Sequence, residues 1–543
     1  MKKSSFLEGT MIATLSIILV KFLGMLYVIP FYATVGVLGS ALYAYAYNIY
    51  IIFLDISSAG LPTAISKIIN EYNTLGKMDA KMRAYNIGKK IITLVSVAVF
   101  IILFIFAKPI ATLIIGDITG GNTIEDVAFV IRCVSFAILV VPYMSVTKGF
   151  LQGHKIINVS SISQIIEQVV RISIILIGSY LGVKVFHLSM RNTIGIAVFS
   201  AFVAGLCAIS YIFVVMRKHK EELGFTKEYK KDNVTNKEIV KKIFAYAIPF
   251  IIIDIAVSIY NFIDMVLIMH TLNYLNLDAT TIEFSATAIS TWSAKIGMIV
   301  NSVAMGMSVS LIPTIVSAYT LKKWNEVNDK LNQALQLILI SSVPMVVGIS
   351  LLSKPIWSIF YGYNINGAII LSCHIFTSLF FNIYVVTSST LQSLNKFKAV
   401  YLSTLSGFLT NALLDVPLML LFNALGLRPY LGAILATCIG YSLSVFIALK
   451  ILKKNSHISY KSTYKVLFKI LLSTIVMIGA VLIVKSIVPL NPNSKLMCIL
   501  YICLVTVVGA FAYAFTGVKT GLIKDVFKED YLNKIKKKLT FKK

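Results

Sequence analysis

The stretch TMIATLSIILVKFLGMLYVIPFY, residues 10–32, contains a single charged side chain, Lys21. The rest of it is apolar enough to cross a membrane, because a spanning helix needs about 20 such residues. A lysine near the centre of a bilayer costs roughly 2.5–3.5 kcal/mol on insertion scales. A second lysine, Lys295, lies inside another apolar run, residues 286–319. We expect both costly charges to have a use, namely to hold an anion in a cavity within the membrane.

The composition of the whole chain agrees with these two segments. The protein has 543 residues, of which 57% are hydrophobic and only 13% are charged, and its mean hydropathy is +0.84. Soluble domains carry about 25% charged residues. The formal net charge of +27 would suggest nucleic acid in a soluble protein, but the cytoplasmic loops of membrane proteins also collect lysine and arginine. We therefore predict an all-α integral membrane protein that binds no nucleic acid.

Fourteen apolar runs divide the sequence into predicted membrane spans. They lie near residues 10–32, 43–67, 90–115, 127–149, 158–182, 193–216, 243–270, 286–319, 333–352, 367–391, 399–424, 430–450, 466–488 and 497–517. About 39 of the 50 basic residues fall in segments that this map assigns to the cytoplasm, and about 6 fall in outside loops. A missed span would invert this alternation from that point on. We predict 14 transmembrane helices in a bacterial cytoplasmic membrane, with both termini in the cytoplasm.

The start of the chain resembles a signal peptide only in part. Lys2 and Lys3 precede the first apolar run, but that run is too long for a signal peptide and no A-x-A cleavage site follows it. We expect it to remain as the first span.

Three short matches indicate an internal duplication. Each recurs at an offset of about 240–250 residues, in the same order and near the ends of corresponding spans. Because six is an even number of spans, two six-helix copies have the same orientation. This predicts two parallel repeats with a substrate site between them, followed by two additional helices. The matches are Pro62-Thr63 with Pro313-Thr314, Lys108-Pro109-Ile110 with Lys354-Pro355-Ile356, and Leu151-Gln152 with Leu391-Gln392.

The repeat and the charged loops predict five segments. We expect the longest basic loop to be a solvated cytoplasmic linker that contacts anionic lipid. The segments are an N-terminal six-helix lobe at 1–216, the linker at 217–242, a C-terminal six-helix lobe at 243–452, two additional helices at 453–518 and a basic cytoplasmic tail at 519–543.

Three motifs carry a resemblance to a known family. They are Ala59-Gly60-Leu61-Pro62-Thr63-Ala64-Ile65-Ser66-Lys67, Lys148-Gly149-Phe150-Leu151-Gln152-Gly153-His154 and Gln164-x-x-Glu167-Gln168-x-x-Arg171. The chain resembles the polysaccharide-biosynthesis branch of the MOP flippase superfamily, in the group of stage V sporulation protein B and the MurJ-like lipid II flippases. The resemblance implies export of an undecaprenyl-pyrophosphate-linked sugar or peptidoglycan precursor. It also implies a V-shaped cavity that opens alternately to the two sides of the membrane.

The cations of the predicted spans are the candidate ligands for the pyrophosphate. Lysine suits this role as a compact point charge, and MurJ-like proteins carry cationic residues in helices 1, 2 and 8. Lys21 and Lys295 match two of these helices, whereas the second span carries Asp55. Asp55 would either pair with Lys21 or carry a coupling proton. The alternative for both lysines is snorkelling or a buried pair with an aspartate.

A third candidate cation has a partner on its own helix. Glu167 and Arg171 are spaced i, i+4, so they share one face and can pair. We expect this pair to be structural, and a role for Arg171 as a further pyrophosphate ligand stays open.

Carboxylate and amide side chains in the second half suggest a cation site. Asp264 lies in the seventh span, and Asn411 and Asp415 share one face of the eleventh. Their oxygens suit a hard cation such as Na⁺, and the resemblance implies a sodium site between helices 7, 11 and 12. Asp254 is a rival for the ligand of the seventh span, and the alternative is capping or hydrogen bonding between helices. We therefore expect no cofactor, with coupling to Na⁺ or H⁺.

Absent motifs narrow the function further. The sequence contains no G-x-x-x-x-G-K-[ST], no G-x-S-x-G and no H-E-x-x-H, so we expect neither direct use of ATP nor a catalytic site.

The first hypothesis is a flippase whose partners are a lipid-linked oligosaccharide or lipid II, membrane lipids and, as an open alternative, envelope-synthesis proteins. The second hypothesis is a multidrug exporter of the related MATE branch, whose cationic substrates would favour an acidic cavity. The third is a non-transporting scaffold for envelope synthesis.

Overall fold

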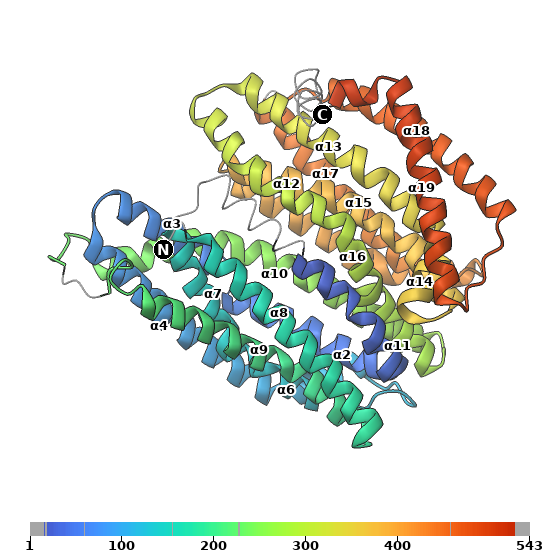
Figure 1. Cartoon of the computed structure of the whole chain (residues 1–543), viewed down its shortest axis with the longest axis horizontal. Helices are drawn as coiled ribbons and strands as arrows, with labels where there is room; N and C mark the ends of the chain where they lie inside the picture. Colours follow the sequence, from blue (N-terminus) through green and yellow to red (C-terminus); the bar gives the residue numbers. More distant parts are fainter. Residues whose placement is uncertain are drawn as a thin grey trace, which may run out of the picture. The chain divides into compact units, whose positions relative to one another are not determined.

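The computed structural model describes residues 16, 19–58, 60–154, 156–225, 229–456 and 458–526, and it leaves out further side chains within these ranges. The described residues form helices and connecting turns, and no β-strand occurs among them (Figure 1). Eleven helices in this part of the chain are long and apolar enough to cross a membrane. The prediction of an all-α membrane protein is thus confirmed.

Three of the fourteen predicted spans lie outside this set of eleven. Of the predicted span at 10–32, the structure describes only residue 16 and residues 19–32. The spans predicted at 243–270 and 286–319 are helical, but several of their side chains are not described. The number fourteen therefore stays a prediction.

The chain divides into two compact units, Met1–Thr291 and Trp292–Lys543. The first unit contains α2 (Val28–Ser58), α3 (Leu61–Thr74), α4 (Met78–Ile105), α5 (Ala107–Ile115), α6 (Ile124–Ser135), α7 (Ala137–Gly153), α8 (Ile157–Tyr180), the π-helix η1 (Leu181–Val185), α9 (Met190–Lys218), α10 (Asn236–Tyr274) and α11 (Ala279–Thr287). A second π-helix, η2 (Ala288–Ser293), contains the boundary. The second unit contains α12 (Ala294–Thr320), α13 (Trp324–Leu351), α14 (Ser353–Tyr361), α15 (Ile365–Ser393), α16 (Phe397–Ala424), α17 (Tyr430–Ser456), α18 (Lys461–Ile487) and α19 (Lys495–Lys519).

The boundary between the units differs from the predicted linker at 217–242. The helix α10, which follows that linker, packs in the first unit against α2, α3, α4 and α5. The six-helix lobes inferred from the repeat stay a prediction.

A left-handed glycine turns the chain back on itself within α2. Gly36 has a φ of 68° inside the helix, a conformation that glycine adopts without steric cost. The rings of Phe31 and Tyr43 lie 5.0 Å apart between centroids, whereas a continuous helix would separate these positions by about 18 Å. The chain therefore reverses near Gly36, which agrees with the predicted break between the first two spans.

Two of the quoted motifs pack against each other in the first unit. A Cβ atom on Gly149 would lie 2.4 Å from the carbonyl oxygen of Pro62, and one on Gly153 would lie 2.8 Å from that of Ser66. These glycines are spaced i, i+4 on α7, so α3 approaches that face at backbone distance. The motifs thus explain a close helix pair.

The same helix pairings recur in the second unit. In the first unit, α3 and α4 both pack on α7, and α8 packs on α9. In the second, α12 and α13 both pack on α15, and α16 packs on α17. The match of Leu151-Gln152 with Leu391-Gln392 aligns Gly149 with Ser389.

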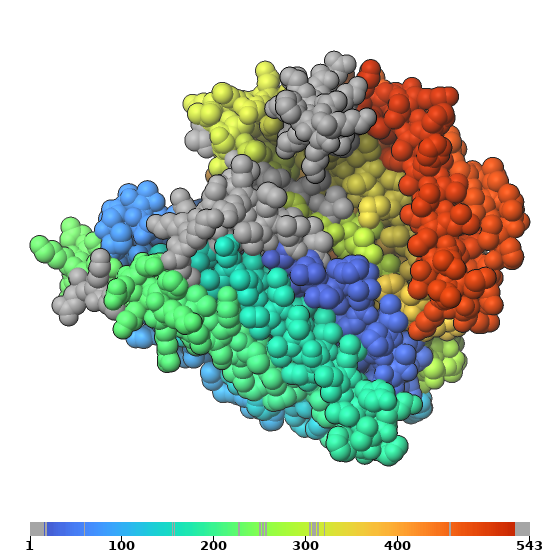
Figure 2. Space-filling model, in the orientation of Figure 1, coloured from blue at the N-terminus to red at the C-terminus, as the bar shows by residue number. Residues whose placement is uncertain are grey.

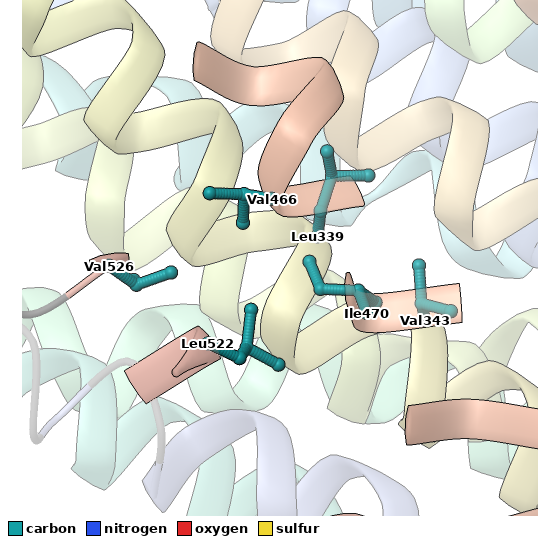
Figure 3. Packing of buried hydrophobic residues seen from close by; sticks show 6 residues of the cluster. All are labelled: Leu339, Val343, Val466, Ile470, Leu522 and Val526. Carbon is teal, nitrogen blue, oxygen red and sulfur yellow. The ribbon is translucent and has the colours of Figure 1, made fainter. Parts of the chain in front are cut away.

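Apolar side chains fix α18 and the helical residues after α19 to α13. Figure 3 shows this cluster, in which Leu339 and Val343 of α13 meet side chains of α18 and of the helical residues 522–526. The other cluster members are Val466, Ile470, Leu522 and Val526. The opposite faces of α18 and α19 expose large apolar side chains (red in Figure 2), including Phe468, Ile475, Ile487, Val507 and Phe511. Such a surface suits lipid better than water.

The described part of the basic linker is attached to the first unit. The Asp232 carboxylate accepts a hydrogen bond of 2.9 Å from the amide of Ala80 near the start of α4. Arg83 pairs with Asp79 and donates to the carbonyl of Val234 at 2.8 Å. The linker therefore ties α4 to the start of α10, and its predicted contact with anionic lipid stays a prediction.

Candidate substrate and ion sites

Lys21 lies in a helical segment that packs against α8. Residues 19–26 are helical, and Lys21 is partly buried within them. A Cβ atom on Gly24, one turn later, would lie 3.1 Å from Nε2 of Gln168 on α8. The segment that carries Lys21 is therefore next to the helix that carries Arg171.

Arg171 is part of a partly buried group of three charges. Its guanidinium pairs with Glu167 at 2.5 Å, and Nζ of Lys148 on α7 lies 3.4 Å from the other oxygen of the same carboxylate. The predicted pair is thus present, and the group keeps a net charge of +1.

The space beside this charged group is small. Arg171 and three tyrosines of α2, Tyr43, Tyr47 and Tyr50, line a cavity of about 10 Å³, which has room for about one water molecule. In this conformation the cavity is too small for a pyrophosphate, so the additional role of Arg171 stays a prediction.

Asp55 makes a contact between two helices of the first unit. The hydroxyl of Ser258 on α10 donates a hydrogen bond to Oδ2 of Asp55 on α2. This contact matches neither of the two roles expected of Asp55, as partner of Lys21 or as proton carrier, and both stay predictions.

Lys295 is buried at the beginning of α12 in the second unit. Its side chain is in contact with Trp292, with Nζ 5.4 Å from a ring centroid, and the residue is only 8% exposed. Trp292 lies in η2, and its carbonyl oxygen accepts a hydrogen bond of 3.0 Å from the hydroxyl of Tyr361 on α14. The lysine thus follows a point where the chain is fixed to a neighbouring helix.

Asn411 and Asp415 lie on the buried stripe of α16. Both are fully buried, and they follow Gly407 at intervals of four residues. A Cβ atom on Gly407 would lie 2.5 Å from the carbonyl oxygen of Gly440 on α17. Asn411 and Asp415 therefore share one face of α16, as two ligands of one cation would require. This face packs on α17.

The expected third ligand, Asp264, is buried on α10 of the first unit, and the side chain of its rival Asp254 lies outside the described residues. The three predicted cation ligands, like the two predicted pyrophosphate ligands Lys21 and Lys295, come from both units. Each therefore stays a prediction.

Glu283, a buried carboxylate on α11 of the first unit, was not singled out from the sequence. Glu283 on α11 is fully buried, and it accepts hydrogen bonds from the amide and the side chain of Asn122. Tyr45 of α2 lies against the same carboxylate. The only signal in the sequence was an acidic residue three positions before the apolar run at 286–319.

Comparisons with known proteins agree with this architecture. The profile of a family described as "Polysaccharide biosynthesis protein" matches residues 6–319, and that of a family described as MatE matches residues 249–416. The Bacillus subtilis protein described as "Lipid II flippase MurJ" is 32% identical over 96% of this chain and 97% of its own length. The stage V sporulation protein B of the same organism is 23% identical over 80% of each chain.

Solved structures share the fold. A lipid II flippase MurJ in an inward closed conformation superposes with a TM-score of 0.65 at 17% identity, over 93% of this chain and 98% of the other. An inward-facing MATE transporter gives a TM-score of 0.62 at 15% identity, over 80% of this chain and 96% of the other. The chain therefore belongs to the polysaccharide biosynthesis family of the MOP superfamily, among the MurJ-like flippases, and is a multi-pass membrane transporter and not an enzyme.

Proposed function

We propose that this protein is a flippase that moves an undecaprenyl-pyrophosphate-linked precursor of the cell envelope, lipid II or a polysaccharide repeat unit, across a bacterial cytoplasmic membrane. The observation that carries this proposal is the near full-length similarity to the lipid II flippase MurJ of Bacillus subtilis. Two lysines inside apolar segments, Lys21 and Lys295, supply the positive charge that a pyrophosphate requires.

The architecture of the proposal is fourteen helices in two parallel six-helix repeats plus α18 and α19, with both termini in the cytoplasm. The distribution of basic residues and the recurring helix pairings support it. Such repeats commonly enclose a substrate site near the middle of the membrane and alternate its access between the two sides.

A groove in the second unit supports a lipid-linked substrate. An apolar cavity of about 440 Å³ lies among α12, α13, α14, α18 and α19. Its walls include Met345, Gly348, Met477, Gly509 and Tyr513. In the proposed cycle the prenyl tail occupies this groove while the pyrophosphate meets the lysines.

The energy source of the proposed cycle is the membrane potential or a cation gradient. A potential of 100 mV is worth about 2.3 kcal/mol for each elementary charge that moves across it. Asn411 and Asp415 would hold Na⁺ through their side-chain oxygens, with Asp264 as the third expected ligand.

Complementation tests the proposal. In a strain depleted of this protein, Lys21→Ala and Lys295→Ala should each abolish growth and translocation, while expression in the membrane is unchanged. Lys108→Ala is the matched control, because Lys108 makes an exposed pair with Glu125 at 2.6 Å. Full complementation by the double variant Lys21→Ala/Lys295→Ala would refute the role of the lysines.

The match of residues 249–416 to the MatE family favours a multidrug exporter as the second candidate function. Buried lysines are unsuited to cationic drugs, which an acidic cavity would bind better. Loss of drug resistance without a defect in the cell wall would favour this candidate.

A further inference from the structure

Two arginines of the first unit lie beside the same face of α6. The guanidinium of Arg191, on the first turn of α9, is 4.5 Å from the ring centroid of Phe129 on α6. Arg132 follows Phe129 by three residues, so it lies on the same face of α6. Both arginines act electrostatically on the carboxylate of Glu125, one turn before Phe129. The fold therefore brings two positive charges to one place.

Helix packing fixes the positions of both arginines. A Cβ atom on Gly195 of α9 would lie 2.6 Å from Cε1 of Phe129, and Gly195 is one turn after Arg191 on the same face of α9. Nε of Arg132 donates to the carbonyl oxygen of Phe104, near the end of α4, at 3.4 Å. This bond uses one of the five N–H donors of the guanidinium. Donors that could bind a ligand therefore remain.

The neighbouring carboxylates are engaged with other groups. Glu125 pairs with Nζ of Lys108 at 2.6 Å, and Asp126 forms the capping box at the start of α6. Among the residues that the structure describes, no carboxylate forms an ion pair with Arg132 or Arg191. Two like charges held side by side repel each other. A bound anion would relieve this repulsion.

The surroundings of the arginines suit a lipid. In the predicted topology, α6 and α9 both begin on the outer side of the membrane, where only about 6 basic residues lie in loops, against about 39 on the cytoplasmic side. Ile105 and Phe106, directly after Phe104, are 62% and 53% exposed. Their apolar side chains border the cationic group. A ligand at this place would meet positive charge and an apolar surface together.

We propose that Arg132 and Arg191 bind the phosphate group of an anionic phospholipid in the outer leaflet. The planar guanidinium fork matches the oxygens of a phosphate, and Ile105 and Phe106 offer contacts for the acyl chains. A soluble anion would gain nothing from this apolar border, so the observations favour a lipid. The site goes beyond the proposed function, because it uses neither Lys21 nor Lys295.

The test uses the full-length protein in vesicles of phosphatidylcholine, labelled with a trace of phosphatidylglycerol that carries a photoreactive headgroup. Peptide mapping should place the label on α6 and on the start of α9. Arg132→Gln and Arg191→Gln should each weaken labelling there about fivefold, and the double variant should weaken it about twentyfold. Arg428→Gln is the matched control, since it removes an arginine from the loop between α16 and α17 of the second unit. It should leave labelling of α6 and α9 unchanged.

Glu125→Gln separates charge from general destabilisation. It removes the nearest negative charge, so labelling of α6 and α9 should increase several-fold, whereas a merely structural role of this carboxylate would give no increase. High salt should weaken the labelling.

Unchanged labelling of the double variant, or equal labelling of this site by photoreactive phosphatidylcholine, would overturn the inference. So would a photoreactive undecaprenyl pyrophosphate that labels this site and that phosphatidylglycerol does not displace. If the double variant does not fold, as judged by its melting temperature, the single variants and Glu125→Gln decide by the same criteria.

Discussion

Arg171 in the first unit is a partly buried cation and Lys295 in the second is a buried one, and their surroundings differ. Arg171 pairs with the Glu167 carboxylate at 2.5 Å, and Lys148 approaches the same carboxylate. Lys295 instead has its ammonium against the ring of Trp292. The carboxylate opposes the charge of Arg171 directly, whereas the ring of Trp292 attracts the ammonium through its quadrupole. The comparison indicates that the chain supports its intramembrane cations through two different kinds of contact.

Removing each cation should lower stability by different amounts. Arg171→Met leaves the partly buried Glu167 with only the longer contact to Lys148, so we expect a loss of stability of about 2–3 kcal/mol. Lys295→Met removes a cation–π contact with Trp292, so we expect a smaller loss, of about 1 kcal/mol. Melting temperatures of the purified variants check both expectations. Adding Glu167→Gln to Arg171→Met should restore stability, and an equal loss in the two single variants would contradict the comparison.

The two units also differ at the helix pair that the repeat duplicates. Gly149→Ala would place a methyl group 2.4 Å from the Pro62 carbonyl, and we expect a loss of about 1–3 kcal/mol. Ser389→Ala, at the matching position of α15, should have a small effect because a Cβ atom is already present. Thermal unfolding measures both. Gly479→Ala is the control for helix propensity, because a Cβ atom there meets no neighbour within 4 Å, and wild-type stability of Gly149→Ala would refute the packing role.

The apolar groove in the second unit extends the comparison from the charged part of the substrate to its uncharged part. In the proposed cycle the lysines meet the pyrophosphate and the groove holds the prenyl tail. Gly348 lines the groove, and a Cβ atom there meets nothing within 4 Å. Gly348→Leu should slow translocation in proteoliposomes several-fold, because its side chain occupies space assigned to the prenyl tail. Gly479→Leu is the matched control, since it adds the same side chain to an exposed face of α18. Equal rates for the two variants would exclude this route for the tail.

The smallest expected effect concerns the ion pair between Asp79 and Arg83 at the start of α4. Partial burial opposes ionisation of Asp79, but hydrogen bonds from the Arg83 side chain and the Asp232 amide outweigh it and hold the pKa of Asp79 below its usual range. A lowered pKa in the folded state stabilises the protein above the unfolded pKa of about 3.9. This contribution is lost as the pH falls through the folded-state pKa.

Asp79→Asn should therefore lower stability at pH 7 by less than about 1 kcal/mol, because the pair is close to water. Melting temperatures across pH should show the difference from the unchanged protein shrinking as the pH falls below about 4 and vanishing only below the folded-state pKa of Asp79. A difference that persists at low pH would contradict the electrostatic explanation.

The hydropathy of the sequence predicted most of the helices because apolar length alone decides whether a segment can span a membrane. The break between the first two spans was also predictable, since Gly36 lies between two apolar runs. The boundary between the compact units lies after α10, whereas the predicted linker precedes it, because α10 packs on helices of the first unit. Packing between distant helices depends on the shapes of their side chains, and the hydrophobic periodicity of the sequence does not reveal it.

Of the candidate site, the sequence predicted only the charged residues. Lys295 and Arg171 stood out as cations in apolar runs, and the i, i+4 spacing predicted the partner of Arg171. Trp292 was missed, although it is one of three tryptophans and lies three residues before Lys295. Tyr361 had no signal, because its contact with Trp292 joins residues that are distant in the sequence.

Depletion of the protein in its native cell, followed by mass analysis of the lipid-linked intermediates, tests the central claim most directly. The account predicts that an undecaprenyl-pyrophosphate-linked precursor accumulates. It also predicts that the wild-type protein reverses the accumulation and Lys295→Ala does not. An unchanged pool of lipid-linked precursors, together with a loss of drug resistance, would contradict it.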